Sequence, residues 1–321
     1  MRFLCAYRPL SHDRIEGVLN MSAETTVHSA NTSSGPTPSE YIQHHLQHFQ
    51  MNFSFENVKQ KSIIDFSLFN LDSLFFSVIS GMLGCFLLWR VAKSATSGVP
   101  GRLQAGIEML VELVDNQARG VIRNENSRRM ISPLALTVFI WIFLMNFMDM
   151  IPVDLLPGIW LSAGPALGFN DYMRVVPTAD LSTTLGLSFS VLLVCLFYNL
   201  KIKGVGGWMH ELFTAPFGNK FYLYPINFIM QLIEFAAKTV SHGMRLFGNM
   251  FAGELVFMLI ALMGGVWAWQ FNPASSGFWM GVGHVIAGTI WTLFHILVIT
   301  LQAFIFMMLT LIYTGQAHDA H

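Results

Sequence analysis

Two basic side chains stand inside a long apolar stretch of this sequence. Lys238 and Arg245 are the only Lys or Arg residues in the run 222–262. An arginine keeps its proton in a protein, whereas a lysine can lose it. A guanidinium in an apolar setting therefore supplies a permanent positive charge, which favours the ionised form of any carboxylic acid brought close to it. This chemistry suits a path along which protons hop onto and off a carboxylate.

Polar residues on both sides of Arg245 recur with helical spacing. They form a stripe of Glu234, Lys238, Ser241, Arg245 and Asn249. On a helix, steps of three and four residues put all of them on one face, which in a membrane indicates an aqueous or protein-facing surface. For Glu234 and Lys238, four residues apart, a plain ion pair within the helix explains the spacing equally well.

A second polar stripe follows in the run 281–313. It consists of His284, Gly288, Thr292, His295 and Gln302. Histidine titrates near neutral pH and suits proton relay, as does a carboxylate such as Glu254. Simpler roles also fit: a hydrogen bond between helices for His295, an interfacial position for His284, and helix pairing for Glu254. If the two stripes face one another, they line a conduit for ions.

These residues stand in apolar runs that are long enough to cross a membrane. Hydrophobic residues make up 53% of the 321-residue chain and charged residues only 12%, about half of their share in a soluble domain. A helical crossing takes about 20 residues. Such runs lie near 73–93, 133–152, 181–200, 222–262 and 281–313. The sequence predicts an all-α polytopic membrane protein with about five crossing helices, in a single membrane domain over residues 61–321.

The last two runs are longer than a perpendicular crossing requires. As a helix, 222–262 would extend about 60 Å, roughly twice the hydrocarbon thickness. It is either one strongly tilted helix or two short spans that turn near Gly243–Gly248, which would leave Arg245 at the membrane surface. No proline follows Pro225 in this run, and the polar face is continuous. We therefore expect both of the last helices to be long and strongly tilted.

Basic residues in the connections give an orientation. Lys and Arg cluster in residues 90–129 and recur in 201–220, whereas 264–280 contains neither. The positive-inside rule then leaves the N-terminus outside the cytoplasm and the C-terminus inside. Residues 1–60 form a polar N-terminal region, and both Met1 and Met21 fit as its start, so that residues 1–20 are an extension in one of the two cases.

Composition and motifs argue against several other functions. The net charge of −1 gives no basic field for nucleic acid. The cysteines are scattered, and the chain has neither a CxxC pair nor an HExxH motif, so we expect no metal site. No P-loop occurs, so we expect no nucleotide site. A secondary transporter would have inverted repeats, and a membrane enzyme a nucleophile with its base; neither pattern is found.

Four segments closely resemble subunit a of F-type ATP synthases, best in its proteobacterial form. They are 243–257 (GMRLFGNMFAGELVF), 294–306 (FHILVITLQAFIF), 145–154 (MNFMDMIPVD) and 95–101 (ATSGVPG). The resemblance runs from about Pro38 to the C-terminus. It implies a proton-translocating channel subunit of the membrane sector, Fo, that couples proton flow to ATP synthesis, with no cofactor and no catalysis of its own.

The resemblance also assigns roles to residues. Arg245 matches the family's essential arginine, which faces the ring of c subunits, prevents leak and promotes proton release. Functional polar positions of the family match Asn249, Glu254, His295, Gln302 and Asp149. Ser241 and His284, from the two stripes, are expected in the same proton path. Many members carry Glu at the position of Gln231, so Glu234 is expected to act in its place.

The implied mechanism uses two offset half-channels. Protons pass from the outer face along Glu254, His295 and Asn249 to a carboxylate of the c ring. Near Arg245 this carboxylate ionises and releases its proton towards the cytoplasm, along the side of Glu234. The implied partners are the c-subunit ring, the b subunits, the rest of the ATP synthase and membrane lipid. The implied location is the bacterial inner membrane, with a periplasmic N-terminus and a cytoplasmic C-terminus. The two histidines favour H⁺ as the coupled ion and leave Na⁺ open.

Overall fold

A computed structural model gives the structure of this chain. It describes residues 42, 50–52, 68–96, 98–122, 124–152, 155–156, 158–159, 174–214, 217–218, 220–265 and 275–316. All of them belong to one compact unit, Pro38–His321. The polar region expected at residues 1–60, with its alternative starts at Met1 and Met21, lies almost wholly outside the described residues.

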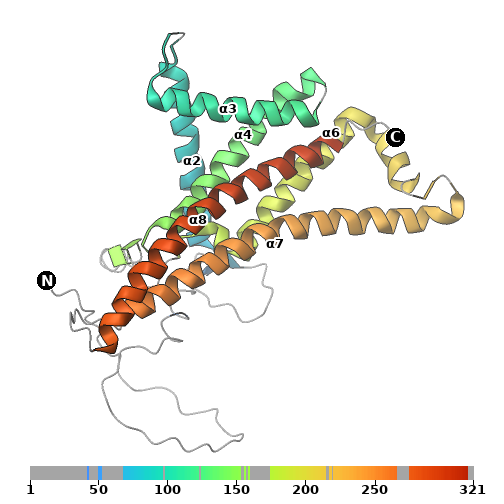
Figure 1. Ribbon diagram of the computed structural model, residues 1–321. Helices are drawn as coiled ribbons and strands as arrows, with labels where there is room; N and C mark the ends of the chain where they lie inside the picture. Colours follow the sequence, from blue (N-terminus) through green and yellow to red (C-terminus); the bar gives the residue numbers. More distant parts are fainter. Residues whose placement is uncertain are drawn as a thin grey trace, which may run out of the picture. The chain divides into compact units, whose positions relative to one another are not determined.

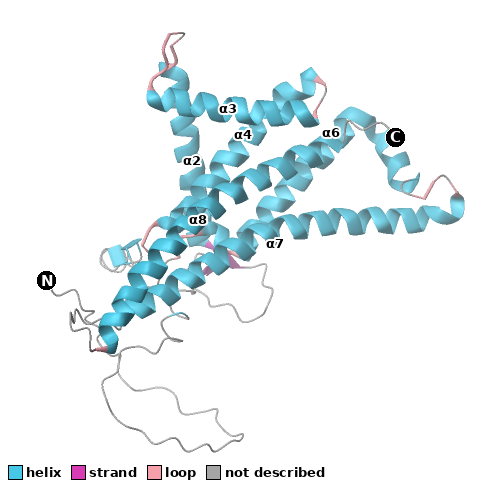
Figure 2. Cartoon of the chain, in the orientation of Figure 1, coloured by secondary structure: helices cyan, strands magenta, loops and turns pink. Residues whose placement is uncertain are grey.

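Five of the described helices are long and apolar enough to cross a membrane. They are α2 (Leu71–Ser94), α4 (Glu125–Phe147), α6 (Leu181–Thr214), α7 (Tyr224–Gly265) and α8 (Ser276–Gly315), shown in Figure 1. The prediction of an all-α polytopic membrane protein with five crossings is confirmed. The other elements are short, apart from one further helix (Figure 2): α3 (Arg102–Val121), η1 (Met148–Met150), η3 (Pro177–Ala179), η4 (Phe221–Leu223), and the antiparallel strands β1 (Gln50–Asn52) and β2 (Leu68–Asn70).

α4 begins well before the apolar run that predicts it. The side chain of Asn124 caps the helix, because its Oδ1 accepts a hydrogen bond from the backbone N–H of Asn126 at 3.0 Å. Glu125 adds a negative charge to the first turn, which the helix dipole favours. Pro133 therefore lies inside the helix rather than at its start, a position that membrane helices tolerate.

α6 has the opposite feature, since it continues past its apolar part. Gly204 has a φ of 70°, in the left-handed region that favours glycine, and it bends the chain there. The run expected near 181–200 is thus the straight first part of α6. The residues beyond Gly204 form a separate helical segment that ends at Thr214.

α7 and α8 are the longest helices, with 42 and 40 residues. At a rise of 1.5 Å per residue, each extends about 60 Å. α7 is helical throughout Gly243–Gly248, so the alternative of two short spans that turn there is excluded. A helix of this length fits a hydrocarbon layer of about 30 Å only with a strong tilt or with ends that project from it.

α3 is the helix that the apolar runs do not predict. It is amphipathic: Val114 and Ala118 are buried, while most of its charged residues are exposed. Figure 1 shows it lying across the ends of α2 and α4, and it also contacts α8. Its signal in the sequence is the helical spacing of a few apolar residues among charged ones, which is weaker than a continuous apolar run.

The two ends of the helix bundle differ in charge. At one end, here called the basic end, Gly315 of α8 packs against Val121 of α3, close to the basic residues of α2 and α3. At the other, here called the acidic end, η3 contacts α2 and α6, and η1 contacts α7. Four carboxylates lie buried there: Asp72, Asp149, Asp180 and Glu254.

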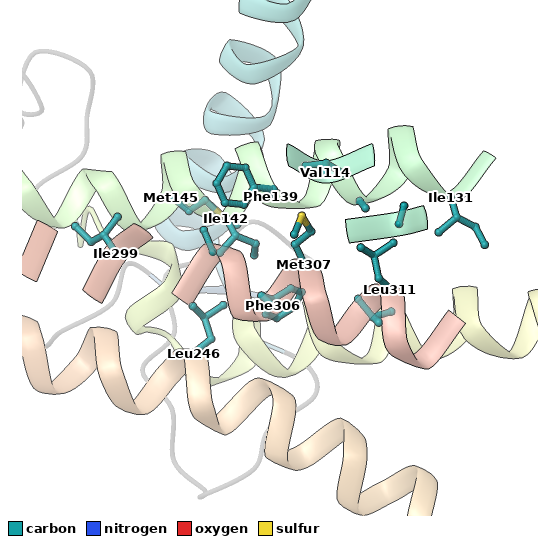
Figure 3. Close-up of a cluster of buried hydrophobic side chains, with 14 of the residues drawn as sticks. Val114, Ile131, Phe139, Ile142, Met145, Leu246, Ile299, Phe306, Met307 and Leu311 are labelled. Carbon is teal, nitrogen blue, oxygen red and sulfur yellow. The ribbon is translucent and has the colours of Figure 1, made fainter. Parts of the chain in front are cut away.

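An apolar core joins α8 to its neighbours (Figure 3). Ile142 and Met145 of α4 pack against Ile299 of α8, and Leu246 of α7 reaches towards the same helix. The small residues Ala135 and Ala303 are fully buried and allow close approach of the backbones. The core therefore fixes which face of α7 turns inward.

α6 and α7 approach one another most closely at Gly243. A Cβ atom on Gly243 would lie 2.9 Å from Cδ2 of Leu185 and 3.1 Å from the carbonyl oxygen of Thr184. One turn earlier, the hydroxyl of Ser188 donates a hydrogen bond to the carbonyl of Thr239. This contact holds α7 in a defined rotation about its own axis.

The close approach yields a stability prediction. Gly243→Ala should lower the free energy of unfolding by about 1–3 kcal/mol, because the added methyl group meets backbone atoms that cannot move aside. Thermal unfolding of the chain in detergent measures this effect. The matched control is Gly186→Ala on α6, where a Cβ atom has nothing within 4 Å. Equal midpoints for the two variants would contradict the packing described here.

Candidate functional site

Glu254 and Arg174 form a buried ion pair at the acidic end. Each residue is 5% exposed. Nε of Arg174 donates a hydrogen bond to Oε1 of Glu254 at 3.2 Å, and Nη2 donates to Oε2. The backbone N–H of Arg174 donates to Oδ2 of Asp72 at 3.2 Å. Arg174 thus connects α7 with the start of α2 and satisfies a carboxylate that would otherwise be costly to bury.

The sequence analysis did not single out Arg174, because this residue lies before η3 and outside every apolar run. The pairing joins positions 80 residues apart, which no helical spacing reveals. One signal was present: Arg174 is the only Lys or Arg between residues 130 and 200.

His295 and Asp149 form a second buried pair. Nε2 of His295 lies 2.6 Å from Oδ2 of Asp149, and the two side chains are 1% and 3% exposed. η1, directly after α4, presents Asp149 to α8. The structure thus brings together two residues that the sequence singled out separately. An imidazole against a carboxylate can take up or give up one proton while the pair stays buried.

The two pairs are neighbours on α7. A Cβ atom on Gly253 would overlap Cε1 of the His295 ring, so the glycine makes the room that this ring occupies. Glu254 is the next residue along the helix. The rings of Phe257 and Trp291 flank His295, with centroids 5.1 Å and 6.2 Å away. Together the pairs form a compact group of ionisable side chains inside an apolar wall.

The other predicted residues of α8 lie on either side of His295. Nδ1 of His284, a half-buried residue, lies 2.7 Å from the carbonyl oxygen of Ile260 on α7, so that this nitrogen is the donor. Gln302 is 6% exposed. The two alternatives for His284 were proton relay and an interfacial position; this contact adds a hydrogen bond between α7 and α8 that neither of them includes. Within the described residues, no group of three His, Cys, Asp or Glu side chains is arranged to hold a metal ion.

Arg245 lies on the outward side of α7. It is half-buried, and its stripe neighbours Ser241 and Asn249 are exposed. A Cβ atom on Gly248 would have nothing within 4 Å. Among the described residues, the Arg245 guanidinium has no hydrogen bond or ion pair. An ionised group in a membrane costs at least about 2.5–3.5 kcal/mol, so this face calls for a polar or charged partner outside the chain.

The expectation that the two polar stripes face one another is wrong. The α7 stripe is exposed or half-buried along its length, whereas His295 and Gln302 of the α8 stripe are buried. α7 instead turns His242, Leu246 and Met250 inward. The apolar core and the contact at Gly243 set this rotation, and neither can be read from the spacing of polar residues alone.

Glu234 and Lys238 form the intrahelical ion pair that their spacing allows. Nζ of Lys238 lies 2.6 Å from Oε1 of Glu234, and the two side chains are 25% and 50% exposed. Nζ also donates a hydrogen bond to Oε1 of Gln316 at 2.9 Å. Lys238 therefore links α7 to the end of α8 at the basic end.

The small residues around Arg245 divide into two groups. Gly243 and Gly253 are buried and serve contacts within the chain, with Leu185 and with His295. Gly248 and Ala252 are exposed on the face of Arg245. Small residues on a membrane helix allow another helix to approach closely. Gly248 and Ala252 therefore allow a helix of a partner to approach α7 closely beside Arg245.

Comparison with known proteins gives a consistent result. The family described as ATP synthase A chain matches residues 74–315. The chain is 63% identical over 299 residues to the ATP synthase subunit a of Acidovorax sp. (strain JS42), a match that covers 91% of this chain and 100% of that protein. The subunit a of Paracidovorax citrulli (strain AAC00-1) is 62% identical over 301 residues, with the same two coverages. That of Verminephrobacter eiseniae (strain EF01-2) is 59% identical over 298 residues, again covering 91% and 100%.

The Arg174–Glu254 pair yields a second prediction. Arg174→Met should lower the free energy of unfolding by about 3–5 kcal/mol, because it leaves the Glu254 carboxylate buried and unpaired. Arg119→Met is the control, since Arg119 is 61% exposed in its pair with Asp115, and exposed pairs contribute about 0–1 kcal/mol.

Unfolding of the double variant Arg174→Met/Glu254→Met completes a double-mutant cycle. It should be more stable than Arg174→Met alone, because no unpaired charge remains. Additive losses in the cycle would mean that the two side chains are not coupled.

Proposed function

This chain belongs to the ATP synthase A chain family and is the proton-channel subunit of the membrane sector, Fo, and from that premise we propose that Arg245 stands where two proton half-channels meet. The subunit has several membrane crossings. We further infer a bacterial inner membrane, with the acidic end and the N-terminus towards the periplasm and the basic end and the C-terminus towards the cytoplasm. The proposed direct partners within the complex are the c-subunit ring and the b subunits.

Proton uptake, in this proposal, uses the acidic end. The His295–Asp149 pair takes the proton, since a neutral imidazole can accept one and the carboxylate 2.6 Å away stabilises the imidazolium that forms. Glu254 lies next to this pair on α7 and is the carboxylate that protons pass on the way in. Its ion pair with Arg174 supports a fixed position for this charge. Gln302, His284 and Asn249 line the remaining way to the outward face of α7.

At that face the proton passes to a carboxylate on a c subunit, which then turns through lipid in its neutral form. When the carboxylate reaches Arg245, the guanidinium favours its ionised form and the proton leaves. Because the guanidinium does not give up its own proton, it cannot pass protons directly between the half-channels. The observation that carries this proposal is a membrane arginine on an outward face with no ion-pair partner in the described part of its own chain.

Proton release is proposed on the side of the basic end. Ser241 is exposed one turn from Arg245, and Glu234 lies two turns further along the same face. Glu234 is 50% exposed, which supports a role as the acid that many family members carry at the position of Gln231. A proton that crosses 100 mV gains about 2.3 kcal/mol, so several protons must combine for each ATP.

The rotor contact is proposed along Ser241, Gly248, Asn249 and Ala252. These side chains are small or polar and exposed, with Arg245 between them. A helix of the ring can then approach α7 closely enough for its carboxylate to meet the guanidinium. Larger side chains at these positions would hold the two charges apart and weaken their interaction.

The function is tested at Arg245. Arg245→Ala should abolish ATP-driven proton pumping in inverted membrane vesicles, while the soluble head still hydrolyses ATP. The physical reason is that no fixed charge then drives the ring carboxylate to ionise. Lys220→Ala is the control, because Lys220 is an exposed basic residue just before η4 and should retain most of the pumping. Normal pumping by Arg245→Ala would refute the proposed role.

The rotor face is tested by cross-linking. A cysteine at Asn249 should form a disulfide with a cysteine on the carboxylate-bearing helix of a c subunit under mild oxidation. A cysteine at Leu193, which is 51% exposed on α6, is the control and should not react. Gel mobility of the a–c product measures the outcome. Reaction at position 193 without reaction at 249 would assign the ring to another face.

A further inference from the structure

His242 is a buried histidine that neither the sequence analysis nor the proposed half-channels use. It is 2% exposed, and its Nε2 has no hydrogen-bond partner in the described part of the chain. Its ring packs at a tilt of 36° against Phe306 of α8, with centroids 3.8 Å apart, and its centroid lies 5.9 Å from that of Tyr313. A buried ring nitrogen without a partner costs about 1–3 kcal/mol, so this position calls for an explanation.

A cavity of about 40 Å³ adjoins this histidine between α6, α7 and α8. Most of its lining surface is apolar, but five polar side chains contribute to it: Ser188 and Asn199 from α6, Thr239 and Lys238 from α7, and Gln316 after α8. A polar cavity of about 10–15 Å³ is already large enough for one water molecule. The chamber formed by these residues and His242 therefore has both the size and the polar groups to hold water.

The chamber extends from His242 to the basic end. Lys238 of α7 and Gln316, just after α8, both line it and are hydrogen-bonded to each other. Gln316 is exposed. At its other limit, His242 precedes Arg245 by three residues on α7, with the histidine ring turned inward and the arginine on the outward side. The chamber thus lies between the outward arginine and the aqueous side of the basic end.

We propose that this chamber is an inner route for proton release, in which His242 accepts the proton that the ring carboxylic acid gives up beside Arg245. The inference rests on the proposed function and adds a residue and a path to it. The carboxylic acid O–H bond breaks, the carboxylate stays beside Arg245, and the proton binds Nε2 of neutral His242. The imidazolium then gives the proton to water in the chamber, which carries it to the basic end, and the histidine returns to its neutral form.

The charges around His242 favour a short-lived imidazolium. Arg245 and Lys238 on α7 are both positive, and their repulsion pushes the proton onward into water. Cys195 of α6 and Tyr313 of α8 are the titratable groups that line the chamber from the other two helices. Glu234 is drawn to Lys238 on the outer face and does not line the chamber. Proton return towards Arg245 is thereby disfavoured.

The competing explanation is packing alone, because the His242 ring stacks on Phe306. Two variants separate the explanations. His242→Phe keeps an aromatic ring for the stack and cannot bind a proton. His242→Gln keeps a polar side chain and cannot titrate. His210→Gln is the matched control, since His210 is an exposed histidine on α6 beyond Gly204.

The experiment measures proton flux through Fo in inverted vesicles from which the soluble head has been removed. A potassium diffusion potential drives the flux, and the pH of the cytoplasmic face is lowered stepwise from neutral, since a buried imidazole beside a positive charge binds a proton less readily than a free one. Both His242 variants should lower the flux by about tenfold or more. A positioned proton carrier typically contributes about 10²–10⁴-fold, but water provides a parallel route here and reduces the loss. Both should also lose the dependence on cytoplasmic-face pH that the unsubstituted channel and His210→Gln retain.

Wild-type flux and an unchanged pH profile in His242→Phe would overturn the inference. If Arg245→Ala still abolishes pumping in the same strain, the proposed function stands and only the inner route fails. If Arg245→Ala pumps normally, the proposed function itself fails, whatever the His242 variants do.

A second measurement needs no change at His242. Cys195 lines the chamber, so silver ion applied to the cytoplasmic face should react with it through the water and block the flux. Cys195→Ser should remove this sensitivity, and its hydroxyl can still donate to the carbonyl of Tyr313 as the thiol does. Both proteins should carry Cys85→Ser, because Cys85 is an exposed free thiol. Flux that silver does not inhibit in the protein with Cys195 would mean that the chamber is closed to water and would also overturn the inference.

Discussion

The free-energy cost of a charge in hydrocarbon governs the arrangement of this protein. At the acidic end it is met by pairing: Glu254 with Arg174, and Asp149 with His295. Each pair joins segments that lie far apart in the sequence, so the pairs also fasten the helices to one another. Arg245 is the exception, because no described residue of its own chain neutralises it. This cost is the physical basis of the proposal that a carboxylate of the c ring meets Arg245.

Close packing puts these charges where they can act. Gly253 leaves the space that the His295 ring fills, and Gly243 lets α7 lie directly on α6. The apolar core between α4, α7 and α8 then fixes the rotation of α7. As a result, Arg245 and Asn249 face outward while His242 faces inward, although all three lie within two turns of one helix.

The sequence predicts the helices better than it predicts the pairs. Apolar runs and helical spacing depend on residues near one another, so the five crossings and the continuous α7 could be foreseen. The partners of Glu254 and His295 depend on contacts across the bundle, and Arg174 was therefore not singled out. α3 was missed because an amphipathic surface helix has no continuous apolar run. Periodicity alone gave a face of α7 but not its neighbour, and only the resemblance indicated that Arg245 faces outward.

The two kinds of ion pair differ in how they respond to dissolved salt. Mobile ions screen charges in water over about 8–10 Å at ordinary ionic strength but cannot enter the acidic-end core. The Arg174–Glu254 pair therefore keeps its strength in brine or in dilute medium, whereas the half-exposed Lys238–Glu234 pair loosens as salinity rises. A rise in ionic strength therefore weakens ion pairs at the basic end of this subunit and leaves those of the acidic-end core unchanged.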